Sequence, residues 1–287
     1  MTERAYAKLN LSLDVLKKQP DGYHDMRMVM QSVEFGDDID IELDRTGQFS
    51  ILPGQVYLPA DGRNLALRAA KLFLEGTGLG AHIRVTKRTP VCAGMGGGSS
   101  DAAAVLRCLN RLTGSPRSVA ELCELGLTLG SDVPFCIVGG TALAEGRGEL
   151  LTPLTPLPDC SIVVCKPAFA ISTPELFGLI DSRKGRLHPD TDGMLGALAE
   201  GDLTGIARRM YNVFEDVLDR RQQEVFSIKR ELLSGGAIGA AMTGTGSAVF
   251  GLFSDGTAAQ QTCARLSAQY KECCLTHPSP AISLKNC

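Results

Sequence analysis

Apolar and polar side chains alternate along residues 5–15, between Ala5 and Val15, with Lys8 and Asn10 in the polar positions. A period of two predicts a half-buried strand. Side chains two residues apart in a strand point to the same side. Lys8 and Asn10 are therefore expected to lie side by side, as the first candidates for chemistry.

The same reasoning along the chain predicts a mixed fold. Alternating or short apolar runs predict strands at residues 26–33, 39–43, 82–86, 135–143, 161–165 and 248–253. Helical spacing predicts helices at residues 64–75, 102–112, 118–129 and 258–270, with further helical stretches between 173 and 233. Strands and helices do not alternate strictly, so α+β is the predicted class. Three prolines within residues 151–158 place a boundary between domains of residues 1–155 and 156–287.

Composition narrows the function classes. The 287 residues are 44% hydrophobic with a formal net charge of -3, and Lys and Arg are dispersed, so neither nucleic acid nor an anionic membrane surface is an expected partner. No apolar run resembles a signal peptide or a membrane span, and a cytoplasmic protein is expected. The ten cysteines are scattered and the four histidines stand apart, so reduced thiols are expected and a zinc site is not.

A glycine-rich segment, Gly94-Met95-Gly96-Gly97-Gly98-Ser99-Ser100, lies between the strand at 82–86 and the helix at 102–112. Glycines let backbone amides converge on an anion, and a helix N-terminus adds its unpaired N–H groups, so phosphate is the expected ligand. Ser99 or Ser100 is the predicted N-cap. A Walker A loop would need a lysine, and Ser99 stands at the third glycine of a Rossmann loop, so neither motif fits. A tight strand-to-helix connection without a ligand is the alternative.

Two charged residues could serve phosphoryl transfer. Such a reaction needs a carboxylate to accept a hydroxyl proton and cations to neutralise charge. Asp132, in the loop after the helix at 118–129, and Lys8 are the candidates, although a turn carboxylate and a solvated lysine are simpler interpretations. A second glycine segment, residues 242–247, is either a plain turn or another backbone approach to a ligand.

Together these segments resemble one family, the GHMP kinases, over residues 5–253. The motifs occur in the family's order: Ala7-Lys8-Leu9-Asn10-Leu11, Asp21-Gly22-Tyr23-His24, residues 90–103, Gly130-Ser131-Asp132-Val133-Pro134-Phe135, Gly139-Gly140-Thr141-Ala142, Gly146-Arg147-Gly148-Glu149 and Met242-Thr243-Gly244-Thr245-Gly246-Ser247. The Asp-Gly-Tyr-His element is typical of members whose alcohol substrate carries cytosine.

The resemblance implies a fold and an activity. The expected fold has an N-terminal domain like domain 2 of ribosomal protein S5 and a ferredoxin-like C-terminal domain, with ATP and substrate in the cleft between them. The expected activity is ATP-dependent phosphorylation of the 2-hydroxyl of 4-diphosphocytidyl-2-C-methyl-D-erythritol, in non-mevalonate biosynthesis of the isoprenoid precursor isopentenyl diphosphate. Asp132 is the implied general base, and Lys8 the cation that keeps it ionised and stabilises the forming alkoxide. Mg²⁺ would bridge the phosphates, with Ser100 as a ligand.

The implied binding residues form two sets. Those for ATP are Asn64, Pro90, Val91, Cys92, Ala93, Gly94, Met95, Gly96, Gly97, Gly98, Ser99 and Ser100. Those for the alcohol substrate are Asn10, Tyr23, His24, Phe169, Gly244, Thr245 and Gly246, with Tyr23 and Phe169 expected to stack on the cytosine.

Some features depart from the family pattern or leave alternatives open. Tyr6 replaces a common Pro, Met95 a Leu, and Thr243 and Thr245 two serines. The alternatives are another GHMP kinase, for homoserine, mevalonate or a sugar, and a non-catalytic nucleotide-binding regulator. A monomer or weak homodimer is expected. The tail at residues 277–287 has no assigned role.

Overall fold

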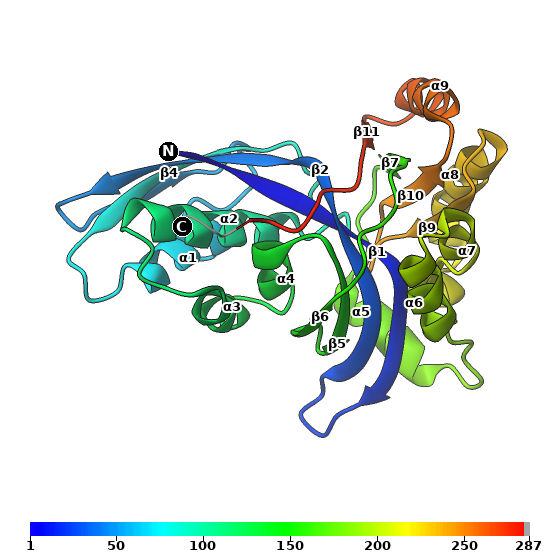
Figure 1. The fold of residues 1–287 in the computed structure, drawn as a ribbon, viewed down its shortest axis with the longest axis horizontal. Coiled ribbons are helices and arrows are strands. Elements are labelled where there is room, and N and C mark those ends of the chain that lie inside the picture. The colour runs from blue at the N-terminus through cyan, green and yellow to red at the C-terminus, as the bar shows by residue number, and fades with distance from the viewer. Residues whose placement is uncertain (284–287) are drawn as a thin grey trace.

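The computed structural model describes residues 1–283 and contains two sheets (Figure 1). The strands are β1 (Thr2–Lys18), β2 (His24–Asp44), β3 (Phe49–Leu52), β4 (Gly80–Thr86), β5 (Thr141–Gly146), β6 (Leu150–Pro153), β7 (Ser161–Lys166), β8 (Tyr211–Asn212), β9 (Gly239–Met242), β10 (Val249–Phe253) and β11 (Glu272–Thr276). The larger sheet has the order β3-β4-β2-β1-β8, with β5 on β2 and β6 on β5. The smaller sheet has the order β11-β7-β10-β9.

Helices gather against each sheet (Figure 1). They are α1 (Leu65–Phe73), α2 (Gly97–Leu112), α3 (Val119–Leu127), α4 (Val133–Val138), α5 (Thr173–Ser182), α6 (Thr191–Glu200), α7 (Leu203–Arg208), α8 (Gln223–Ser234) and α9 (Gly256–Ser267), with 3-10 turns at Val213–Val217 and Arg220–Gln222. α2 packs on β1 and β2, and α8 and α9 pack on the smaller sheet. Within residues 1–283 no helix has the length and apolar content to cross a membrane.

The long hairpin of β1 and β2 carries the first half of the protein. Residues 5–15 form part of β1, as predicted, and their apolar side chains are buried. The strand is not half-buried, however, because the alternate polar side chains Lys8, Asn10, Ser12 and Asp14 are buried as well. Residues 26–33 and 39–43, predicted as separate strands, belong to one strand, β2. The pairing shifts from Tyr6 opposite Gly36 to Lys8 opposite Ser32, so β2 has two more residues than β1 at this irregularity, which lies between its two predicted segments.

The prediction of a strand over residues 135–143 was wrong in its first half. Residues 133–138 form α4, with Pro134 in its first turn, where proline is favoured, and the strand starts only at Thr141. Val133 to Ile137 are all buried, and a short run buried on every side has no periodicity that separates helix from strand. The strands β3, β6, β8, β9 and β11 were not predicted.

The predicted boundary at residue 155 falls between β6 and β7, where the chain passes from the larger sheet to the smaller one. The chain later returns twice. β8 pairs with β1 through Tyr211 opposite Ser12. The tail also returns, since the Ser279 amide donates to the Ser32 carbonyl at 2.8 Å and Ala281 bridges to Gly139. The described part of the tail thus ties the two parts together, and residues 284–287 lie outside the described residues.

Candidate active site

The glycine-rich segment connects β4 to α2 and lies directly over β1. The Lys8 amide donates to the Met95 carbonyl at 3.1 Å. At Gly96, which has φ +68°, an added Cβ would lie 3.0 Å from Cγ of Lys8, so glycine permits this approach. Gly96, not Ser99 or Ser100, is the N-cap of α2. The predicted serine cap was therefore wrong, because the left-handed glycine starts the helix earlier.

The second glycine segment interlocks with the first. The Thr243 hydroxyl donates to the Gly94 carbonyl at 3.2 Å, and the Ala248 amide donates to the Ala93 carbonyl at 3.2 Å. An added Cβ on Gly94, which has φ +76°, would lie only 2.0 Å from the Thr243 carbonyl oxygen. Residues 242–247 are thus more than a turn, since they hold the glycine-rich segment from the other part of the chain.

Lys8 and Asp132, 124 positions apart in the sequence, come together at this junction. Nζ of Lys8 lies 3.7 Å from Oδ2 of Asp132 and donates to Oδ1 of Asn10 at 2.8 Å. Lys8 is only 5% exposed, so it is not a solvated surface lysine. Asp132 stands at the N-cap position of α4 but makes no side-chain capping bond. Its carboxylate, with a side chain 34% exposed, is therefore available beside a buried ammonium group.

Asn10 organises the backbone next to Lys8. Its Oδ1 also accepts from the Gly244 backbone N–H at 3.0 Å, and the backbone N–H of Asn10 donates to the Thr243 hydroxyl at 3.1 Å. The predicted pairing of Lys8 and Asn10 on one strand face is confirmed by their hydrogen bond. Asn10 therefore connects the ammonium group to the second glycine segment.

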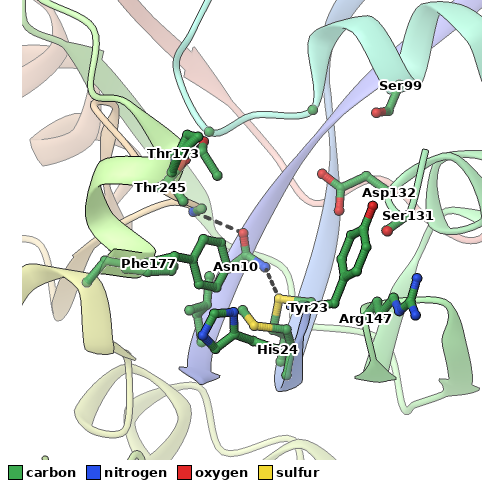
Figure 2. Close-up of a pocket in the computed structure, with 18 of the residues that line it drawn as sticks. Asn10, Tyr23, His24, Ser99, Ser131, Asp132, Arg147, Thr173, Phe177 and Thr245 are labelled. Carbon is green, nitrogen blue, oxygen red and sulfur yellow. Dashed lines mark hydrogen bonds between the residues drawn. The ribbon is translucent and has the colours of Figure 1, made fainter. Parts of the chain in front are cut away.

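Two cavities meet at the glycine-rich segment. One, of about 710 Å³, is lined by Lys8, Asn10, Gly22, Tyr23, His24, Asp132 and Gly244, among others. The other, of about 450 Å³, is lined by Asn64 and by all of residues 90–99. Gly94, Gly96, Ser99, Thr173 and Thr245 line both cavities. In Figure 2, Ser99 and Asp132 lie across the larger cavity from Thr173 and Thr245, with Asn10 between them.

The far end of the larger cavity is aromatic. His24 stacks on Phe177 of α5 with ring centroids 4.6 Å apart, and the guanidinium of Arg147 lies 4.1 Å from the centroid of Tyr23 (Figure 2). Phe169, the aromatic residue expected here, lines neither cavity and instead packs against the core. That expectation was misplaced, because α5 begins only at Thr173 and turns Phe177 toward the cavity.

Ser100 also differs from the expectation. It is 1% exposed, its hydroxyl donates to the Gly97 carbonyl at 3.0 Å, and it lines neither cavity. Because α2 starts at Gly97, Ser100 turns onto the buried side of the helix. Ser99 is the hydroxyl residue that lines both cavities.

A buried ion cluster in the wall of the smaller cavity, which Lys87 and Asp101 line, was not anticipated. Nζ of Lys87 lies 2.7 Å from a carboxylate oxygen of both Asp37 and Asp101 and 3.3 Å from the Gly97 carbonyl. Burial raises the pKa of Asp101 to about 7, although the Lys87 ammonium opposes that shift. The only sequence signal was the position of Asp101 directly after the two serines. The cluster braces the first turn of α2 from behind.

Comparisons with known proteins agree with this architecture. Residues 64–140 match the GHMP kinases N-terminal domain, and residues 194–272 match the GHMP kinases C-terminal domain. A 4-diphosphocytidyl-2-C-methyl-D-erythritol kinase of Clostridium perfringens is 42% identical over 273 residues, covering 94% of this chain and 95% of that protein. One from Alkaliphilus metalliredigens is 41% identical over 271 residues, covering 94% and 93%.

Solved structures give the same result. The crystal structure of a 4-(cytidine 5'-diphospho)-2C-methyl-D-erythritol kinase has a TM-score of 0.82 at 33% identity and covers 97% of this chain and 99% of that chain. A homoserine kinase from Cytophaga hutchinsonii has a TM-score of 0.73 at 18% identity, which is a likeness of fold alone.

The fold, matched over 97% of the chain, and the relatives at 41–42% identity show a small-molecule kinase that uses ATP. The chain belongs to the GHMP kinase family. Within that family, its relatives at 41–42% identity are 4-diphosphocytidyl-2-C-methyl-D-erythritol kinases. The predicted α+β, two-domain GHMP kinase fold is confirmed.

Proposed function

We propose that this protein transfers the γ-phosphoryl group of ATP to the 2-hydroxyl of 4-diphosphocytidyl-2-C-methyl-D-erythritol, a step in isoprenoid precursor biosynthesis. The observation that carries the proposal is the pairing of Lys8 and Asp132 at 3.7 Å, in the larger cavity and beside the wall it shares with the smaller one. A base and a cation at that junction can act on a hydroxyl that faces a bound phosphate.

The smaller cavity suits the nucleotide. Its glycine-rich wall and the N-terminus of α2 present backbone N–H groups, and the positive end of the helix dipole favours phosphate. Asn64 lines this cavity from the N-cap of α1, where its side chain accepts from the Ala66 amide. ATP would therefore lie along residues 90–99, with its γ-phosphoryl group toward Ser99 and the larger cavity.

The chemistry then falls to Asp132 and Lys8. Asp132 accepts the proton of the alcohol as its oxygen bonds to the γ-phosphorus, while the bond from that phosphorus to the β-γ bridging oxygen breaks and ADP leaves. The Lys8 ammonium, 3.7 Å from the Asp132 carboxylate, stabilises negative charge on the attacking oxygen. Asn10 holds Lys8 in place through its 2.8 Å hydrogen bond.

The residues also fit Mg²⁺ held chiefly by nucleotide phosphates. Within residues 1–283 no group of three or more His, Cys, Asp or Glu side chains could hold a metal ion. Mg²⁺ commonly keeps several waters and binds through phosphates and few protein oxygens, so this sparse set is compatible with it. The Ser99 hydroxyl, on the shared wall, is the candidate ligand, and the ion would neutralise phosphate charge.

The aromatic end of the larger cavity supports a cytosine-bearing alcohol. Tyr23, His24 and Phe177 offer flat faces, and flat bases stack on such faces. Homoserine, mevalonate and simple sugars have no group to fill this end. A cavity of about 710 Å³ is also larger than such small alcohols require.

A coupled ADP-release assay over these four kinds of alcohol tests the proposal. We expect turnover with the cytidine-diphosphate substrate, lowered by at least about a hundredfold in Asp132→Asn and more than about tenfold in Lys8→Ala. Asp202→Asn is the matched control, because Asp202 also occupies a helix N-cap without a capping bond and lines neither cavity. An Asp132→Asn enzyme as active as Asp202→Asn would refute the assignment of the base.

A further inference from the structure

An ion pair joins the aromatic end of the larger cavity to the second part of the chain. Nε2 of His24, at the start of β2, lies 2.7 Å from Oδ1 of Asp181 in α5. Nζ of Lys18, at the end of β1, lies 2.6 Å from the other oxygen of the same carboxylate. All three residues line the larger cavity. Asp181 is therefore held from both strands of the hairpin.

α5 presents two side chains to the same imidazole. Phe177 and Asp181 are four positions apart, which places them on one face of the helix. Phe177 covers the flat face of His24, with an angle of 24° between the rings, and Asp181 takes one nitrogen at the edge. The His24 side chain is 7% exposed, so its orientation is set by these contacts and not by water.

The carboxylate determines which ring nitrogen carries the proton. The hydrogen bond from Lys18, and to a smaller extent that from His24, lowers the pKa of Asp181 below its usual range. The Asp181 carboxylate is therefore ionised, and both of its oxygens accept hydrogen bonds and donate none. Nε2 of His24 must then be the donor. In the neutral ring, Nδ1 is left as an acceptor, and the described residues provide no partner for it.

We propose that Asp181 is a positioning residue that fixes the proton of His24 on Nε2, so that Nδ1 accepts a hydrogen bond from the amino group of a cytosine ring. This inference rests on the proposed function, because it specifies how the substrate's base is recognised. Cytosine carries an amino donor at C4, whereas uracil carries a carbonyl acceptor there. If the C4 carbonyl of uracil faced Nδ1, both the carbonyl oxygen and Nδ1 would be buried acceptors without a donor. A His24 ring with its proton on Nε2 therefore selects cytosine over uracil.

Binding of cytidine 5′-diphosphate and uridine 5′-diphosphate, measured by calorimetry, tests the selection directly. We expect the wild type to prefer the cytidine compound by about tenfold or more, the value of one well-placed hydrogen bond to a buried group. In Asp181→Asn, the amide can present either its oxygen or its NH₂ group to Nε2, so both tautomers are supported. The preference should fall at least about fivefold, because cytidine binding weakens as the competent tautomer becomes less populated and uridine binding strengthens as Nδ1–H becomes available to its carbonyl.

Asp192→Asn is the matched control. The Asp192 carboxylate, also in the second part of the chain, pairs with Arg27 of β2 at 2.6 Å but does not line the cavity. It should leave the preference unchanged. Equal losses in the two variants would mean that any contact between the two parts matters, and would overturn the assignment.

Two further readouts separate positioning from a structural role. Nitrogen chemical shifts of His24 should show the proton on Nε2 in the wild type and a mixture of tautomers in Asp181→Asn. In turnover, Asp181→Asn should raise KM for the alcohol about threefold and leave kcat and KM for ATP unchanged. An unchanged tautomer or an unchanged cytidine preference would refute the proposal. If the wild type prefers the cytidine compound and Asp181→Asn loses that preference, but no turnover occurs, the proposed function fails while this inference stands.

Discussion

The close approach of the two glycine segments allows a quantitative test at Gly94. In Gly94→Ala, the new Cβ would lie 2.0 Å from the Thr243 carbonyl oxygen and 3.1 Å from the Gly246 nitrogen. These are backbone atoms, which cannot rotate away, so the two segments must separate by about 1 Å. The left-handed backbone at φ +76° adds about 1–2 kcal/mol of its own for any residue with a Cβ.

The displacement should appear in catalysis more than in stability. Moving the glycine-rich wall that the two cavities share by about 1 Å is expected to lower kcat/KM for ATP by about a hundredfold. Coupled ADP release at saturating alcohol measures this effect, and urea unfolding measures the loss of stability.

Gly76→Ala separates the two contributions. Gly76 has φ +75°, and an added Cβ there meets nothing within 4 Å, so this variant carries the backbone strain without the overlap. It should lose about 1–2 kcal/mol of stability and keep full activity. If Gly94→Ala matched Gly76→Ala in both measurements, the interlocking of the two segments would not be what shapes the site.

Three further predictions concern buried groups. Arg107→Met should lower the free energy of unfolding by about 3–5 kcal/mol in urea titrations, because buried Arg107 donates to Glu3 at 2.9 Å and to the Cys136 carbonyl at 2.6 Å. Burial raises the pKa of Asp101 in the folded protein to about 7. Its contribution to stability is therefore complete below the pKa of Asp101 in the unfolded chain and is lost as the pH rises through 7. Asp101→Asn should flatten the change in urea midpoint between pH 5 and 8. The Cys165 thiol, opposite Cys273 on the paired strands β7 and β11, lowers the pKa of Cys273 below its usual range. Iodoacetamide followed by peptide mass spectrometry should therefore find Cys273 alkylated faster at pH 7 in the wild type than in Cys165→Ala.

Each of these predictions has a defined contrary result. Arg265→Met, which removes an exposed partner of Glu231, should cost under about 1 kcal/mol, and an equal loss in Arg107→Met would contradict the buried network. A pH dependence of stability unchanged by Asp101→Asn would place the titration in another group. Equal alkylation of Cys273 with and without Cys165 would show that the neighbouring thiol has no influence.

Local patterns predicted the parts of the site that depend on neighbours in sequence. Lys8 and Asn10 share a face because a strand has a period of two, and their hydrogen bond confirms it. The glycine-rich segment was predicted to open a helix, and α2 does begin within it, although at Gly97 and without a serine cap. That shift of a few residues sufficed to move Ser100 from the expected metal site into the helix packing. Helix boundaries depend on backbone geometry that residue type alone does not determine.

Other parts of the site depend on packing between distant segments. The aromatic partner of His24 was expected at Phe169 and is Phe177, because the start and orientation of α5 decide which side chain reaches the cavity. No periodicity points to the contact between His24 and Asp181, which are 157 positions apart. The cluster of Lys87, Asp37 and Asp101 likewise forms only when β2, β4 and α2 meet.

The amino-acid sequence by itself determined that a glycine-rich segment, a strand bearing Lys8 and a loop bearing Asp132 occur in the order of the GHMP kinases. These features follow from residue type and short spacing, which act through the local backbone. Only the tertiary structure decided that Lys8 lies 3.7 Å from Asp132, that Gly94 touches the second glycine segment, and that Asp181 holds His24. Those distances result from burying two apolar cores and pairing strands across the chain, and such long-range contacts leave no periodic trace in the sequence.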